Sequence, residues 1–189
     1  MKRDGFEADK NDLWIMNLET EVKINLTKNW DETVESYRWS NDDKKIYFTA
    51  AIKGTVQLFE LNPNVVTGVS DISQLTKGKF DISGICTQHN QTLYVTRTDM
   101  NHAAEIYAVN LDNGSMQQVT HINDAAYANI KMCEVKERYT PLEGGDNLFS
   151  WVIYPPDFDK NKKYPVLLYC QGGPQSALSL FYSFRWKFQ

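Results

Sequence analysis

The feature that most constrains this chain is a repeat of short strand-like segments over its first two thirds. Three apolar or alternating runs of similar length mark it: LWIMNL at 13–18, QLFELN at 57–62 and EIYAVNL at 105–111. Each run is followed by a turn-rich stretch and then by a Leu-Thr or Val-Thr pair, at Leu26-Thr27, Leu75-Thr76 and Val119-Thr120. The pairs recur at intervals of about 45 residues, the length of one blade of a β-propeller.

A second pair of segments falls between these runs, and each of the two has the pattern strand, polar turn, strand. They are YRWSNDDKKIYFTA at 37–50 and ICTQHNQTLYVTRT at 85–98. Each repeat unit is therefore predicted to hold about four short strands, as a propeller blade does. Between two and three units fit in the chain, which is fewer than the roughly four to eight of a closed ring. We expect a fragment of a propeller, since a β-sandwich would explain the alternation but not the repeat.

The rhythm of the sequence changes past about residue 133. A Gly-Gly-Asp-Asn turn at 144–147 is expected to join strands at 135–139 and 148–154 in a hairpin. The run VLLYC at 166–170 does not alternate, as is typical of a strand buried on both faces of an α/β sheet. Apolar residues from 177 to 188 follow nearly helical spacing.

These patterns predict a mainly β fold with two parts. Residues 1–134 are expected to form about two to three blades of a partial β-propeller, its C-terminal blades. Residues 135–189 are expected to form the N-terminal part of an α/β-hydrolase domain, truncated at the end of this chain.

Composition excludes several classes of partner. The net charge is -4 and the pI is near 5.4, with scattered lysines and arginines, so neither nucleic acid nor an anionic membrane is expected to bind. No apolar run approaches the roughly 20 residues needed to span a bilayer, and no signal peptide is visible. The sequence leaves the cellular compartment open: the protein is either cytoplasmic or exported, for example to the periplasm. Three distant cysteines, Cys86, Cys133 and Cys170, predict buried free thiols and no metal site, and no cofactor is expected.

The glycine pair after VLLYC is the best candidate for chemistry. A strand that ends in a Gly-Gly turn places main-chain N–H groups at the mouth of an α/β sheet, where ligands bind in such folds. In α/β-hydrolases a glycine-rich loop after an early strand supplies one arm of the oxyanion hole. Gly172 and Gly173 are therefore predicted to bind an oxyanion, and a plain structural turn is the alternative.

The order of motifs resembles a known family. The string DNLFSWVIYPPDFDKNKKYPVLLYCQGGP at 146–174 resembles the opening of the catalytic domain in the prolyl oligopeptidase family of serine peptidases, especially its dipeptidyl peptidase IV branch. Upstream, RDGFEADKNDLWIMNL, WSNDDKKIYFTA and AEIYAVNLDNG are similar to late blades of that family's propeller. The resemblance implies a propeller that caps an α/β-hydrolase domain and cleaves peptides, after proline, through an acyl-enzyme.

By the same resemblance, Gln171 stands where the dipeptidyl peptidase IV branch carries a tyrosine whose hydroxyl helps bind the oxyanion. Glutamine departs from that pattern, although its amide can donate a hydrogen bond, and a turn residue is the alternative. Gln171, Gly172 and Gly173 are the predicted oxyanion residues.

No catalytic triad is predicted in this chain. It contains no Gly-x-Ser-x-Gly elbow, and its three histidines, His89, His102 and His121, precede the predicted sheet and are expected at turns and on the surface. The chain alone is therefore predicted to be inactive. Its expected partners are peptide substrates and the remaining blades and catalytic domain of a full-length enzyme, and a homodimer is left open.

Two other functions remain open from the sequence. A non-catalytic propeller with a degenerate hydrolase remnant would serve as a binding module. Another α/β-hydrolase, such as an esterase, would share the oxyanion loop but would not need a propeller in front of it.

Overall fold

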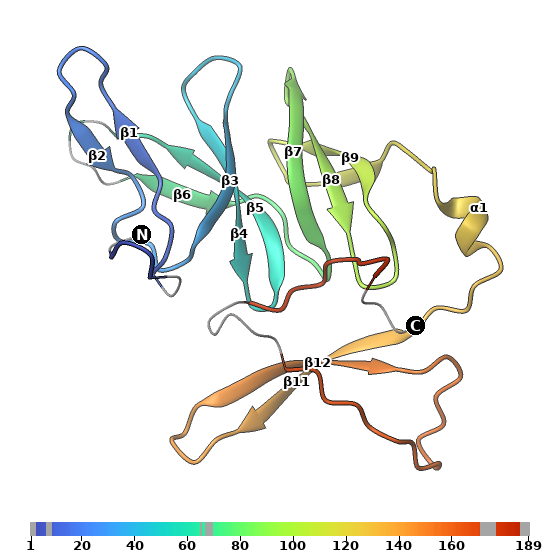
Figure 1. The fold of residues 1–189 in the computed structure, drawn as a ribbon. Coiled ribbons are helices and arrows are strands. Elements are labelled where there is room, and N and C mark those ends of the chain that lie inside the picture. The colour runs from blue at the N-terminus through green and yellow to red at the C-terminus, as the bar shows by residue number, and fades with distance from the viewer. Residues whose placement is uncertain (1–2, 7–8, 65, 67–69, 171–176, 186–189) are drawn as a thin grey trace.

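A computed structural model of the protein describes residues 3–6, 9–64, 66, 70–170 and 177–185. Almost all its regular structure is antiparallel β-sheet, arranged as two four-stranded sheets, a two-stranded sheet beside them and a hairpin beneath (Figure 1). The one helix in the described part of the chain is a single turn, α1 (Asp124–Tyr127). The prediction of a mainly β chain built from propeller blades is confirmed.

The first four-stranded sheet has its strands in chain order, as a propeller blade does. Its members are β3 (Val34–Trp39), β4 (Ile46–Ile52), β5 (Thr55–Asn62) and β6 (Asp71–Gln74). The β3–β4 turn is the predicted polar turn, and Asp43 takes a positive φ of 57° there. Asn and Asp tolerate this left-handed conformation better than most residues, which explains the choice of turn residues.

The second four-stranded sheet repeats this arrangement. It contains β7 (Asp81–His89), β8 (Thr92–Thr98), β9 (Glu105–Asn110) and β10 (Met116–Gln118). β1 (Trp14–Met16) and β2 (Lys23–Asn25) form the two-stranded sheet. The three runs aligned in the sequence thus fall on β1, β5 and β9, so the predicted count of between two and three blades is confirmed.

A threonine closes each sheet in the same way. The hydroxyl oxygens of Thr27, Thr76 and Thr120 each accept a main-chain N–H from the β1, β5 or β9 segment, at 2.8–2.9 Å, with donors Leu13, Leu58 and Ile106. Each hydroxyl in turn donates to the side chain of the residue that precedes its N–H donor in the chain. These residues are Asp12, Gln57 and Glu105. The Leu-Thr and Val-Thr pairs of the sequence are therefore hydrogen-bonded clasps that hold the outer edge of each blade.

The cores lie between the sheets rather than within one of them. One cluster joins the two-stranded sheet to the first blade, where Trp30 meets Phe48 and Phe59 edge-on at 5.3 and 5.2 Å. The other joins the two blades and consists of Tyr47, Leu58, Phe80, Ile82, Leu93, Val95, Val109 and Leu111. A blade of four short strands has two faces and no interior of its own, so its stability depends on its neighbours.

The predicted hairpin is present and lies beneath the blades (Figure 1). β11 (Glu134–Pro141) pairs with β12 (Asn147–Tyr154) in continuous register. The turn between them contains Gly145 with φ of +87°, a conformation that favours glycine.

Two predictions for the C-terminal stretch are wrong within the described residues. Residues 166–170 belong to no strand, and Val166, Leu167 and Leu168 are 86–90% exposed. A strand of an α/β sheet needs parallel neighbours for its main-chain groups, and no described strand lies beside this run. Residues 177–185 form an irregular segment instead of a helix, because short isolated helices are marginal and this segment is held by single buried side chains.

The prediction for the cysteines is correct in part. All three thiols are free, but only Cys133 is buried, and burial raises the pKa of its thiol. Cys86 is exposed because it lies on β7, the edge strand of its sheet, and Cys170 is exposed in the unpaired run.

Candidate functional site

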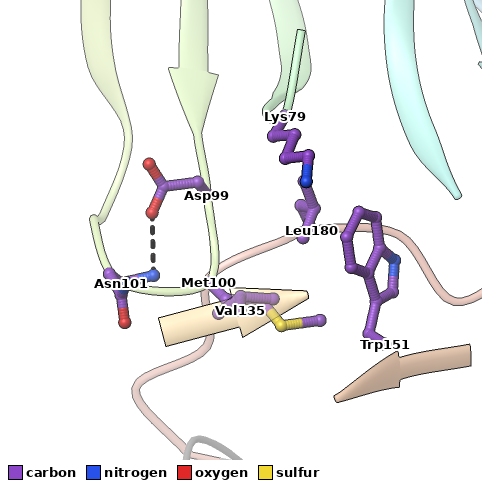
Figure 2. A pocket seen from close by; sticks show the side chains of 7 residues that line it. All are labelled: Lys79, Asp99, Met100, Asn101, Val135, Trp151 and Leu180. Carbon is purple, nitrogen blue, oxygen red and sulfur yellow. Dashed lines mark hydrogen bonds between the residues drawn. The ribbon is translucent and has the colours of Figure 1, made fainter. Parts of the chain in front are cut away.

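The candidate site is a cavity of about 160 Å³ where the lower ends of the blades meet the hairpin (Figure 2). Its walls come from four separate parts of the chain: the β6–β7 connection, the β8–β9 loop, the hairpin and the segment 177–185. The lining residues are Lys79, Asp99, Met100, Asn101, Val135, Trp151 and Leu180.

The hairpin is seated on the β4–β5 turn of the first blade. The Trp151 indole N–H donates to the carbonyl oxygen of Gly54 at 3.1 Å, and the Phe149 ring lies against the same glycine. Lys53 and Gly54 both have positive φ, at 49° and 75°, as a type I′ turn requires. A Cβ on Gly54 would lie 2.2 Å from Phe149 Cε1, so the close approach of the aromatic ring depends on glycine at this position.

The second blade is joined to the hairpin by polar contacts. The Asn101 amide donates to the carbonyl oxygen of Cys133 at 2.9 Å, immediately before β11. Lys79 and Glu137 form an ion pair at 3.6 Å, but both side chains are well exposed, and exposed pairs contribute little stability. The hairpin is thus fixed to both blades, by aromatic packing on one side and by the hydrogen bond from the Asn101 side chain on the other.

The segment 177–185 runs between the blades and the hairpin, from beneath β4 and β5 to beneath β7 and β8 (Figure 1). Leu180 is 2% exposed and points into the cavity beside Trp151 and Lys79 (Figure 2). Ser179, next to it, is also buried. Tyr182 is half-buried, and burial together with the neighbouring Tyr127 of α1 raises the pKa of Tyr182.

The carboxylates of Glu35 on β3 and Asp81 at the start of β7 interact electrostatically between the two blades. Asp81 is buried, and one of its oxygens accepts the main-chain N–H of Val56 at 2.8 Å, which ties the second blade to the first. Glu35 is exposed, but partial desolvation of its carboxyl group raises its pKa above the ordinary value, and the negative charge of Asp81 raises it further. This pair therefore opposes the packing of the blades when both groups are ionised.

The three histidines lie on the surface, as predicted. His102 Nδ1 lies 2.9 Å from the Asp99 carboxylate and His121 Nδ1 lies 2.8 Å from that of Asp124, and the partners in each pair are three residues apart. His89 is exposed at the end of β7. Asp99, His102 and Asp124 also line a second cavity, of about 270 Å³, beside α1. Among the described residues, no group of His, Cys, Asp and Glu could hold a metal ion. The same residues contain no helix long and apolar enough to cross a membrane.

The predicted oxyanion residues, Gln171, Gly172 and Gly173, lie outside the described residues. The chain on both sides of them is described, from Tyr154 to Cys170 and from Ala177 to Arg185. Sequence reasoning missed Trp151, Leu180 and Tyr182 as residues of the site. Their aromatic or apolar character was visible, but burial of an isolated Leu in an irregular segment has no periodic signal.

Comparison with known proteins places this arrangement among the peptidases. Residues 8–140 match the family described as the dipeptidyl peptidase IV N-terminal region. The chain is 37% identical over 186 residues to dipeptidyl-peptidase 5 of Porphyromonas gingivalis, with 98% of this chain and 26% of that protein covered. It is 25% identical over 190 residues to dipeptidyl-peptidase 5 of Aspergillus fumigatus, again with 98% and 26% covered. The chain thus spans about a quarter of the length of these relatives.

Solved structures agree on the fold. The acylaminoacyl peptidase of Pyrococcus horikoshii superposes with a TM-score of 0.74 at 20% identity, covering 97% of this chain and 27% of that one. An acylaminoacyl peptidase in complex with Z-Gly-Gly-Phe-chloromethyl ketone gives a TM-score of 0.71 at 21% identity, with 93% and 26% covered. At these identities the likeness concerns the fold.

Proposed function

Because the chain belongs to the dipeptidyl peptidase IV family of prolyl oligopeptidase-type peptidases, we propose that it is the propeller-to-catalytic-domain segment of a serine exopeptidase that removes dipeptides. The observation that carries the proposal is the order of parts: propeller blades, then a hairpin packed beneath them, then the glycine loop. The identity to dipeptidyl-peptidase 5 over 98% of the chain supports it.

In this proposal residues 1–134 are late propeller blades and residues 135–189 begin the hydrolase domain. The rest of the full-length enzyme supplies the serine, acid and histidine. The serine oxygen adds to the scissile carbonyl while its proton passes to the histidine, and the carbonyl oxygen becomes an oxyanion. The main-chain N–H groups at Gly172 and Gly173, with the Gln171 amide, donate to that oxyanion. Collapse of the intermediate expels the amine, which takes the proton, and leaves the acyl-enzyme for water to hydrolyse.

The substrate is proposed to be a peptide with a free N-terminus. The names of the relatives describe dipeptide removal, and a preference for proline before the scissile bond follows from the family resemblance alone. Removal of dipeptides requires recognition of the terminal amine, so acylation of that amine is expected to abolish cleavage.

The test uses the full-length enzyme and a matched set of p-nitroanilides. Gly-Pro- and Lys-Ala-p-nitroanilide report a dipeptidyl peptidase, and their N-acetylated forms test whether the free amine is required. N-acetyl-Ala-p-nitroanilide reports an acylaminoacyl peptidase, and p-nitrophenyl esters report an esterase. We expect cleavage of the free dipeptidyl compounds. Gln171→Ala should lower kcat by about tenfold to a hundredfold with little change in KM, since the loss of one oxyanion donor acts in the transition state. Absence of activity on every substrate would favour the non-catalytic propeller.

A further inference from the structure

The second cavity, beside α1, contains an arginine that has no ion-pair partner in the described chain. Arg97 is the second-to-last residue of β8, and its guanidinium carbon lies 4.1 Å from the ring centroid of Phe80 and 4.7 Å from that of Tyr107. Arg97 lines the cavity of about 270 Å³ together with Tyr107 and Tyr127. Within the described residues, its only side-chain contacts of a specific kind are those with the two rings.

The carboxylate best placed to pair with Arg97 is occupied by other donors. Glu105 is the cross-strand neighbour of Arg97 on β9, and opposite charges at such positions commonly attract each other. Here the carboxylate oxygens of Glu105 accept hydrogen bonds from the Thr120 hydroxyl and from the main-chain and side-chain N–H groups of Asn123. Glu105 thus belongs to the clasp of its blade, and the five N–H donors of Arg97 remain available to another acceptor.

The other acidic groups of the cavity are also paired. The Asp99 carboxylate lies 2.9 Å from His102 Nδ1 and accepts two main-chain N–H groups of its own loop at 2.8 and 3.0 Å. Asp124 lies 2.8 Å from His121 Nδ1. The three carboxylates that line the cavity therefore have partners nearby, whereas the capacity of Arg97 for an ion pair is unfilled in the described part of the chain.

An arginine held in this way is preorganised for a carboxylate. A guanidinium presents its donors as a planar fork, which a carboxylate fits with two parallel hydrogen bonds. Contact with two aromatic rings restricts the guanidinium before a ligand binds, so less conformational entropy is lost on binding. Phosphate fits the cavity less well, because the carboxylates of its walls repel a dianion more strongly than a monoanion.

We infer that Arg97 anchors a binding site for a small carboxylate that carries a planar or apolar group. The site lies between the β8–β9 loop and α1, where Tyr107 and Tyr127 supply aromatic surface. Its volume of about 270 Å³ is just below the roughly 300–1,000 Å³ typical of pockets for drug-sized ligands, so the ligand is small. The inference is independent of the proposed peptidase reaction, because the site shares no residue with the proposed oxyanion donors.

The experiment titrates hippurate into the longer peptidase proposed above by isothermal calorimetry, after its serine has been blocked with a fluorophosphonate. Hippurate carries one carboxylate and one aromatic ring, hippuramide is its uncharged counterpart, and inorganic phosphate tests a dianion. We expect saturable one-to-one binding of hippurate, at least about tenfold tighter than the binding of hippuramide or phosphate, because charge-assisted hydrogen bonds to the fork require a carboxylate.

Arg97→Gln should weaken hippurate binding about tenfold or more, since both the fork and its charge are lost. Arg97→Lys keeps the charge without the fork, so it should retain only part of the affinity, and it tests the fork even if Arg97→Gln does not fold. Arg138→Gln is the matched control. Arg138 is exposed on β11 and does not line the cavity, so its loss removes the same charge and should leave the affinity unchanged.

Absence of saturable hippurate binding to the wild-type protein would overturn the site, because Arg97 would then serve packing or pair with a carboxylate of the protein itself. Equal affinity of wild type and a folded Arg97→Gln variant would overturn it as well, since the ligand would bind elsewhere. Phosphate binding tighter than hippurate binding would refute a carboxylate as the ligand. Hippurate binding that depends on Arg97, in a protein with no serine that the fluorophosphonate labels, would support the site and refute the proposed peptidase function.

Discussion

At the scale of single residues, hydrogen bonds of the threonines in the Leu-Thr and Val-Thr pairs stabilise each repeat unit. Thr27 and Thr76 are each 1% exposed, and their hydroxyls are both acceptor and donor. A buried hydroxyl with both roles filled can be replaced only by a residue that fills them equally, which is why threonine recurs at the end of each sheet.

Thr76→Val is expected to lower the free energy of unfolding by about 1–3 kcal/mol. The valine is nearly isosteric, but it leaves the Leu58 N–H and the Gln57 side-chain oxygen without their partner. Urea denaturation of the full-length protein measures the change. Thr76→Ser keeps the hydroxyl and both of its hydrogen bonds and is the control, so a Thr76→Val variant as stable as Thr76→Ser or more stable would contradict this account.

Glu35→Gln is expected to raise the melting temperature at neutral and alkaline pH. Because the pKa of Glu35 is raised in the folded state above its ordinary value near 4.5, folding favours its protonated form. The wild-type protein therefore loses stability through this group as the pH rises from about 4.5 through the folded pKa, and the loss is complete above it. Melting curves of wild type and variant from pH 4 to 8 should converge at the acidic end. A variant that is less stable at pH 8 would contradict this account.

At the scale of elements, the hairpin joins the propeller through a turn and two aromatic rings. Phe149 and Trp151 lie in T-shaped contact at 5.1 Å, and both approach Gly54. The strand pairing of β11 with β12 is local, whereas the seat beneath the first blade is made by residues nearly one hundred positions apart, Gly54 and Trp151.

Gly54→Ala is expected to loosen the hairpin from the first blade. Alanine is disfavoured at a φ of +75°, and its Cβ would meet the Phe149 ring. Together these effects should cost about 1–3 kcal/mol. Hydrogen exchange of residues 147–154 should speed up, and Trp151 fluorescence should shift to the red. Gly144→Ala is the control, because nothing lies within 4 Å of a Cβ there, and it should leave both signals unchanged.

At the scale of the whole molecule, large apolar surfaces remain uncovered. Trp14 is 57% exposed and Met16 44% exposed on β1, and Val166 to Leu168 are exposed in a run with no described strand paired to it. Exposed edges and apolar faces of this kind favour association.

The isolated 1–189 chain is therefore expected to self-associate or to unfold in part, and the longer peptidase proposed above is expected to stay dispersed. Light scattering during size-exclusion chromatography measures this directly. Introducing charge into the exposed run, as in Leu167→Lys, should reduce the association of the isolated chain. A monodisperse monomer with a cooperative transition at high temperature would contradict the expectation.

Much of the fold followed from local pattern. The polar turn before β4, the hairpin turn at Gly145 and the strand content of each blade are properties of a few neighbouring residues, and sequence reasoning placed them correctly. It failed where the outcome depends on distant partners. VLLYC has the composition of a buried strand but is unpaired here, and the apolar spacing after residue 177 suggested a helix where Leu180 alone is packed deeply.

By itself, the sequence determined the blades, because a repeat of short strands with a threonine clasp specifies antiparallel pairing within each unit. Tertiary structure alone decided where the hairpin rests, which leucine fills the cavity beneath the blades and which thiols are exposed. These features arise from contacts between segments far apart in the chain, such as Trp151 with Gly54. Such contacts reflect shape and burial, which no local pattern of residues encodes.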